Sequence, residues 1–87
     1  MDALDGNAIA GPLLEHFGTE MTIAVGTCDH CGARAQIAEL VVYTRAPGAV
    51  VRCRHCNNVV MVLISAGAAL RVELSAFTLT DAPGTRR

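Results

Sequence analysis

The sequence predicts a small, mainly β fold of antiparallel strands with one N-terminal helix. Its 87 residues are the length of one domain, which we place at residues 1–80, with a flexible polar tail at 81–87. Short stretches alternate apolar and polar residues or are continuously apolar, as half-buried and fully buried strands do. Four cysteines form two pairs of equal spacing, which is typical of strand-end turns that share a metal ion.

A helix is expected over residues 7–17. Asp5 or Asn7 can cap its start, and Gly18 is placed to end it. Pro12 lacks a backbone donor, so we expect either a bent helix or a helix that begins near this residue. The apolar residues that recur at helical spacing near one face are Ile9, Leu13, Leu14 and Phe17.

The expected strands cover residues 21–25, 35–43, 49–53, 59–64 and 70–77. In the first strand, Met21, Ile23 and Val25 would share one side. The fourth is apolar on both faces and suits a central strand, and residues 46–48 form a turn between the second and third. In the last strand, the residues that share one face are Leu70, Val72, Leu74 and Ala76.

The two cysteine pairs each enclose two residues, and each lies at the end of an expected strand. A predicted hairpin joins the pairs, so folding brings four thiolates together. Four soft sulfur ligands suit a tetrahedral Zn²⁺ site. We therefore expect a zinc ribbon with one Zn²⁺ per chain, held by Cys28, Cys31, Cys53 and Cys56.

The residue after each second cysteine supports this interpretation. Such turns usually need a positive φ at that position. Gly32 supplies it without strain after the first pair, and Asn57 is the best non-glycine substitute after the second. The two pairs therefore agree in a detail that unrelated CxxC motifs need not share.

Other uses of four cysteines fit less well. The N-terminus carries acidic residues where a signal peptide carries basic ones, so we expect a cytoplasmic protein, in which disulfides are rare. A thioredoxin-like dithiol needs one CxxC at a helix start, and haem attachment needs a histidine directly after the second cysteine. Iron in a four-cysteine site uses the same ligands and stays the less favoured metal, because three aromatic residues are too few for a rubredoxin-like core.

No catalytic arrangement is evident, and we expect no enzyme. His30 and His55 occupy equivalent positions before each second cysteine and are expected to be exposed turn residues. Four cysteines already complete a tetrahedron, and a fully ligated ion has no open position for a substrate.

The charge pattern bears on the partner. The net charge is −1 without any block of like charges, which gives no general reason to expect nucleic acid. Arg45, Arg52 and Arg54 are the nearest to a nucleic-acid contact, and a solvated face is the favoured interpretation for them. The longest apolar run, residues 59–64, is far too short to span a bilayer, so no membrane partner is expected.

The motifs DGNAIAG, CDHCG, VYTRAPG and the RC and HCN of the second pair resemble a family of short, uncharacterised, mainly actinobacterial zinc-ribbon proteins. The resemblance covers about residues 4 to 77. It implies zinc ligation by the four cysteines, and Asn57 departs from a more usual glycine. The zinc domain is also similar to that of hydrogenase-maturation nickel metallochaperones, but the Met-His start that binds nickel in those proteins is Met1-Asp2 here.

Three roles remain open from the sequence. The first is a non-enzymatic adaptor whose zinc-stapled surface binds a protein partner or a second copy, with the helix and residues 43–50 as candidate surfaces. The second is a nucleic-acid or transcription-machinery binder, and the third is a sensor in which thiolate oxidation ejects zinc. We favour the adaptor.

Overall fold

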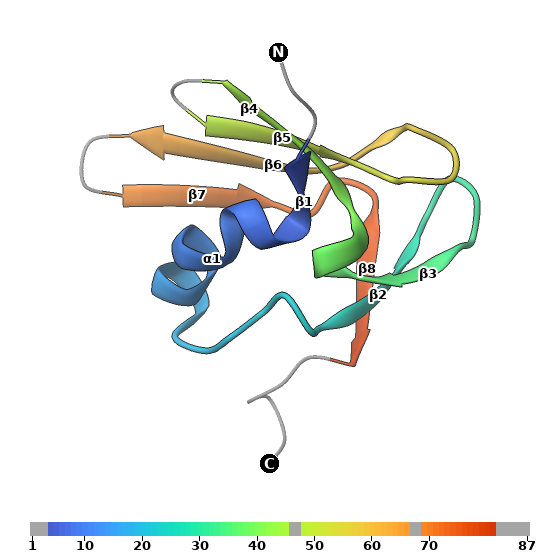
Figure 1. The fold of residues 1–87 in the computed structure, drawn as a ribbon, viewed down its shortest axis with the longest axis horizontal. Helices are drawn as coiled ribbons and strands as arrows, with labels where there is room; N and C mark the ends of the chain where they lie inside the picture. The colour runs from blue at the N-terminus through green and yellow to red at the C-terminus, as the bar shows by residue number, and fades with distance from the viewer. Residues whose placement is uncertain (1–3, 46–47, 67–68, 82–87) are drawn as a thin grey trace.

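The computed structural model describes residues 4–45, 48–66 and 69–81. Within these ranges the chain forms two antiparallel sheets and an N-terminal helical segment (Figure 1). The predicted mainly β, antiparallel fold with one N-terminal helix is confirmed. None of the described helices is long and apolar enough to cross a membrane.

The larger sheet has five strands in the order β1-β4-β5-β6-β7. Its strands are β1 (Leu4–Asp5), β4 (Val41–Arg45), β5 (Gly48–Arg52), β6 (Val59–Ala66) and β7 (Ala69–Glu73). As its apolar sequence predicted, β6 is an interior strand, paired with β5 on one side and β7 on the other. Residues 43–50 lie mostly in β4 and β5, and Ala46 and Pro47 of the expected turn lie outside the described residues.

The smaller sheet has three strands in the order β3-β2-β8. They are β2 (Val25–Cys28), β3 (Arg34–Gln36) and β8 (Phe77–Asp81). The expected strand at 70–77 is therefore two strands in different sheets, separated by a bend at residues 74–76. Asp81, expected in the tail, is the last residue of β8, and residues 82–87 lie outside the described part of the chain.

The N-terminal helical segment begins with a 3₁₀ turn, η1 (Gly6–Ile9), and continues as α1 (Ala10–Phe17). The Asp5 side chain caps η1 by accepting a hydrogen bond from the Asn7 N–H at 3.1 Å, and Gly18 ends α1 with φ 76°. Pro12 falls in the first turn of α1, where its missing N–H costs no helical hydrogen bond.

The expected apolar face of this helix is only half buried. Ile9 and Leu13 are in the core, but Leu14 and Phe17 are 45% and 40% exposed. Leu14 lies about 100° around the helix from the buried Leu13, and Phe17 is the last residue of α1. Two of the four predicted face residues therefore point to solvent.

The strand expected at 21–25 is wrong. Met21 to Ala24 form a turn closed by a 3.0 Å hydrogen bond from the Ala24 N–H to the Met21 carbonyl. The Thr22 hydroxyl and N–H donate to the Glu20 carboxylate, so local side-chain bonding competes with extended backbone. Met21 is buried while Ile23 is 55% exposed, so the two do not share a side.

The strand expected at 35–43 is interrupted by a second 3₁₀ turn, η2 (Ile37–Glu39). The side chain of Gln36 accepts from the backbone of Glu39, and the Glu39 carboxylate accepts from the Gln36 N–H at 2.8 Å. This capping box ends β3 and redirects the chain into β4, which belongs to the other sheet.

Candidate metal centre

The four cysteines lie in two hairpin turns, one from each sheet. Cys28 ends β2, and its turn leads through Cys31 to β3; Cys53 follows β5, and its turn leads through Cys56 to β6. The hairpin expected between the two pairs is present as the antiparallel strands β4 and β5, but β3 and η2 lie between it and the first pair. The two pairs meet where the two sheets meet.

Both turns have the same backbone geometry. The N–H groups of Gly32 and Asn57 donate to the carbonyls of Cys28 and Cys53 at 2.8 and 2.9 Å. The two residues have φ of 80° and 65°, in the left-handed region. The predicted positive φ at both positions is confirmed. Each turn aims its two thiols at one point because the left-handed residue bends the chain back immediately after the second cysteine.

The four sulfurs lie close enough together to share one metal ion. The Sγ atoms of Cys28 and Cys56 are 3.7 Å apart, as are those of Cys31 and Cys53. All four sulfurs lie within 4.8 Å of one another. A Zn–S bond of about 2.3 Å in a regular tetrahedron requires sulfurs about 3.8 Å apart. A disulfide would need about 2.05 Å, and all four cysteines are free.

The site has a buried side and an open side. Cys28 and Cys53, the first cysteine of each pair, are 1% and 3% exposed and belong to the hydrophobic core. Cys56 is half-buried and Cys31 is exposed. A metal ion held by these sulfurs would therefore link both sheets to the core while one edge of its ligand set faces solvent.

Hydrogen bonds to sulfur favour the thiolate form. The His55 N–H donates to Cys53 Sγ at 3.3 Å, and the Asn58 side-chain amide donates to Cys56 Sγ at 3.4 Å. The backbone N–H and side chain of Asn58 together lower the pKa of Cys56 to about 6. Asn58 was not singled out from the sequence, and the only signal was an amide side chain two residues after the second cysteine.

Negative charge on one sulfur opposes charge on the next. The Ala33 N–H favours a thiolate at Cys31, but desolvation and hydrogen bonds to Cys53 and the other sulfurs outweigh it and raise the pKa of Cys31 to about 12. Without a cation the Cys31 thiol thus resists ionisation. A divalent cation removes this opposition, so the chemistry of the four donors fits a thiophilic metal ion.

The two histidines take no part in the sulfur cluster. His30 and His55 are exposed, as predicted, and the group of potential ligands found among the described residues consists of the four cysteines.

Of the three arginines considered for nucleic acid, Arg52 has a hydrogen-bond partner. The guanidinium of Arg52 donates to the Asn57 carbonyl at 2.8 Å and lies 6.0 Å from the Tyr43 ring. Arg54 lines a hollow together with the acidic residues Asp5 and Glu39. The side chain of Arg45 lies outside the described part of the structure. The described side chains therefore do not present a basic face.

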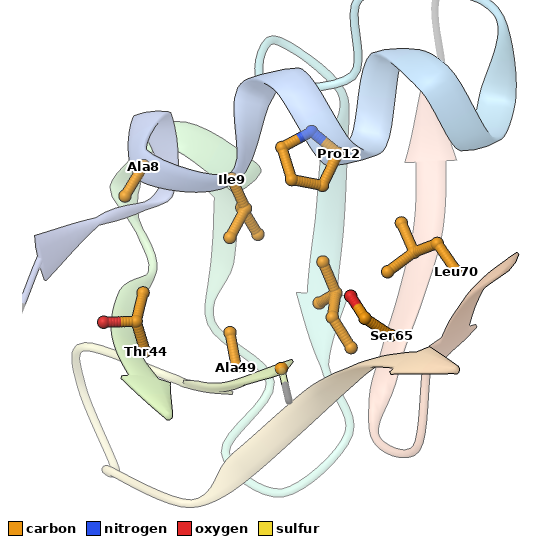
Figure 2. Close-up of a pocket in the computed structure, with 9 residues that line it drawn as sticks. Ala8, Ile9, Pro12, Thr44, Ala49, Ser65 and Leu70 are labelled. Carbon is orange, nitrogen blue, oxygen red and sulfur yellow. The ribbon is translucent and has the colours of Figure 1, made fainter. Parts of the chain in front are cut away.

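A second hollow, of about 320 Å³, lies between the helical segment and the larger sheet (Figure 2). Ile9 and Pro12 form its roof, and β4, β5, β6 and β7 form its floor. Small side chains such as Ala8, Ala49 and Ser65 leave the space open. Its lining carries no titratable group, and incomplete packing under a short helix accounts for it.

Fold and site together define a small, mainly β protein with a four-cysteine centre able to hold a metal ion between two sheets. The chain belongs to a family of unknown function, DUF6510, whose family model matches residues 1–85. This agrees with the uncharacterised family expected from the motifs. No curated protein and no solved structure matches the chain significantly.

Proposed function

We propose that the protein is a non-catalytic zinc domain in which Cys28, Cys31, Cys53 and Cys56 hold one structural Zn²⁺. The observation that carries this proposal is the sulfur geometry: two cross-turn Sγ–Sγ distances of 3.7 Å, close to the edge of a zinc tetrathiolate. Zinc is favoured over iron because four thiolates are a common tetrahedral ligand set for Zn²⁺ and because three aromatic residues are too few for a rubredoxin-like core. Four protein sulfurs leave no coordination position for a substrate.

The zinc in this proposal stabilises the contact between the sheets. Each of the two hairpin turns contributes two ligands, so the metal ion would join the β2–β3 turn of the smaller sheet to the β5–β6 turn of the larger sheet. The domain would then serve as a rigid surface for a protein partner. Exposed apolar side chains support such a role, namely Leu4, Leu14, Phe17, Ile23, Ile64 and Leu74.

Native mass spectrometry of the freshly purified chain, with a thiol count after denaturation, tests the metal assignment. We expect one zinc and four thiols per chain. Cys31→Ser, at the exposed ligand, should lower zinc affinity at least about 100-fold while leaving the core thiols in place.

His30→Ala and His55→Ala are the matched controls, because each removes a potential ligand from the same turns without removing a sulfur. Both should retain one zinc. Iron in the purified protein, or zinc loss in the histidine variants equal to that in Cys31→Ser, would contradict a four-cysteine zinc site.

A further inference from the structure

The outer edge of β7 ends the larger sheet without a neighbouring strand. Among the described residues β7 pairs only with β6, and no backbone hydrogen bond joins its other edge to a loop or turn. The strand is five residues long and apolar on alternate positions. An edge strand of this kind is a template for another strand, unless charge or shape prevents pairing.

The register of the sheet shows which backbone groups of β7 point outward. Ala66 lies opposite Ala69 across a two-residue connection, and such connections are closed by a hydrogen-bonded pair. Bonded and non-bonded pairs alternate, so Ala69, Arg71 and Glu73 bond to β6. The N–H and carbonyl groups of Leu70 and Val72 therefore point away from the sheet.

A second copy of β7 fits this edge in one antiparallel register. If Val72 faces Val72 of a second copy, the outward groups of the two valines bond to each other. Arg71 then faces Glu73 of the other copy, and Glu73 faces its Arg71. A register centred on Arg71 would also align the outward backbone groups of Leu70 and Val72, but it would place two guanidinium groups opposite each other, which destabilises the pair.

The side chains of the edge suit this pairing. Arg71 and Glu73 form an ion pair at 3.1 Å along the strand. Because their side chains are 72% and 51% exposed, each can instead pair with the oppositely charged residue of a second copy. On the opposite face Leu70 would meet Leu74, which follows β7 and is 38% exposed. Oppositely charged and apolar cross-strand pairs both stabilise antiparallel strands.

The remaining long edge strand lacks this complementarity. β8 has threonines and one acidic residue, Asp81, without a cationic residue in the strand to oppose it. The α1 helix, in contrast, contacts β7 and carries the exposed Leu14 and Phe17. The two-fold axis of a β7 pair is perpendicular to the sheet, so both copies of α1 would flank the new strand pair on one face.

We propose that the partner of this domain is a second copy of the chain, joined by antiparallel pairing of β7 with β7 in the register centred on Val72. This assignment deepens the proposed interaction role and rests on it only in requiring the folded chain.

Charge reversal at the edge tests the pairing and its register. In an Arg71→Glu dimer, the new glutamate at 71 of each copy faces Glu73 of the other copy. In a Glu73→Arg dimer, the new arginine at 73 of each copy faces Arg71 of the other copy. We expect each variant to dissociate at least about 10-fold more readily than the wild type, measured by native mass spectrometry and sedimentation over a concentration series. The double reversal R71E/E73R should restore the dimer.

Mixing the two single variants gives the sharpest result. In a mixed pair, the glutamate introduced at position 71 of one variant would face the arginine introduced at position 73 of the other. The unchanged Glu73 of the first variant would face the unchanged Arg71 of the second. The mixture should therefore form heterodimers, although neither variant dimerises well alone.

Val72→Pro provides a second route to the same test. It removes an outward N–H without removing a bond to β6, so it should also dissociate the dimer.

A zinc-bound wild type that stays monomeric up to high micromolar concentration would overturn the pairing. So would a dimer unaffected by Arg71→Glu, or a mixture of the single variants without heterodimers. The same spectra report metal content. A dimer without zinc would therefore contradict the zinc proposal while leaving β7 pairing intact, and a zinc-bound monomer would do the reverse.

Discussion

Asn57 illustrates how far a single residue determines the site. It occupies the left-handed region with φ 65°, and it is the one non-glycine residue with positive φ among those described. Its N–H closes the second turn on Cys53, and its carbonyl accepts from Arg52. The sequence predicted this conformation because asparagine tolerates the left-handed region better than other side chains.

Replacing Asn57 separates backbone cost from side-chain chemistry. Asn57→Ala should destabilise the zinc-bound protein by about 1 kcal/mol, because the alanine Cβ disfavours the left-handed conformation and its side chain makes no local hydrogen bond to offset this. Asn57→Gly should stay within about 0.5 kcal/mol of the wild type. Urea unfolding at a fixed free zinc concentration measures both. Equal losses in the two variants would show that the side chain, and not φ, matters at this position.

At the scale of the elements, the smaller sheet depends on a close contact between a glycine and a ring. Gly26 in β2 is buried, and the ring of Phe77 from β8 occupies the space where a side chain at this position would lie. Phe77 is itself 3% exposed and faces Cys28 in the strand register. The ring thus covers the glycine, and its residue lies opposite Cys28, one of the four candidate metal ligands.

Gly26→Ala should therefore destabilise the protein by roughly 1–3 kcal/mol, because the new methyl forces the Phe77 ring or the β2–β8 pair to move. Gly11→Ala is the matched control. Its methyl meets nothing within 4 Å in α1, so this variant should gain about 0.5 kcal/mol. Thermal unfolding of the two variants at equal zinc concentration checks the contrast, and a stabilised Gly26→Ala would contradict the packing account.

The elements that the sequence failed to predict share a physical cause. Residues 21–25 alternate like a strand, but the Glu20 carboxylate binds Thr22 locally and favours a turn. Residues 35–43 have the apolar and β-branched composition of one strand, but the capping box of Gln36 and Glu39 favours the 3₁₀ turn η2 in the middle of this segment. In contrast, the interior strand β6 and the glycine end of α1 depend on local composition alone, and both were predicted.

At the scale of the whole molecule, the four sulfurs join two sheets that otherwise meet through a small core. Cys28 and Cys53 are core residues as well as candidate ligands. In the metal-free chain, four sulfurs without a shared cation would occupy the junction of the two sheets. A metal ion held there would therefore stabilise the packing of both sheets as well as the two turns.

Removal of zinc should unfold both sheets together. We expect a strong chelator to remove on the order of 10 kcal/mol of apparent stabilisation and to collapse amide dispersion in a ¹H–¹⁵N correlation spectrum across β2, β3 and β8 as well as β4 to β7. Cys53→Ser should give the same spectrum without chelator. Retention of a native-like spectrum with a cooperative melt in either sample would show that the core suffices alone.

The grouping of the four cysteines could be predicted from the sequence, but the strands that position them could not. Spacing and the residues after each pair identify the four cysteines as one group. The two turns come from different sheets because η2 ends β3 and redirects the chain into β4, and the bend at residues 74–76 then sends β8 to pair with β2. This pairing joins residues about 50 positions apart, and local patterns do not report contacts of that range.

The two-residue β1 at the far side of the larger sheet has a consequence for the size of any assembly. It occupies the edge of β4 yet offers too few backbone groups to recruit another strand. A β7 pair uses the same surface on both copies, so it is isologous and consumes the one long edge of each larger sheet. Growth of that sheet by strand addition therefore stops at ten strands, twice the five of one chain, and does not continue into a filament.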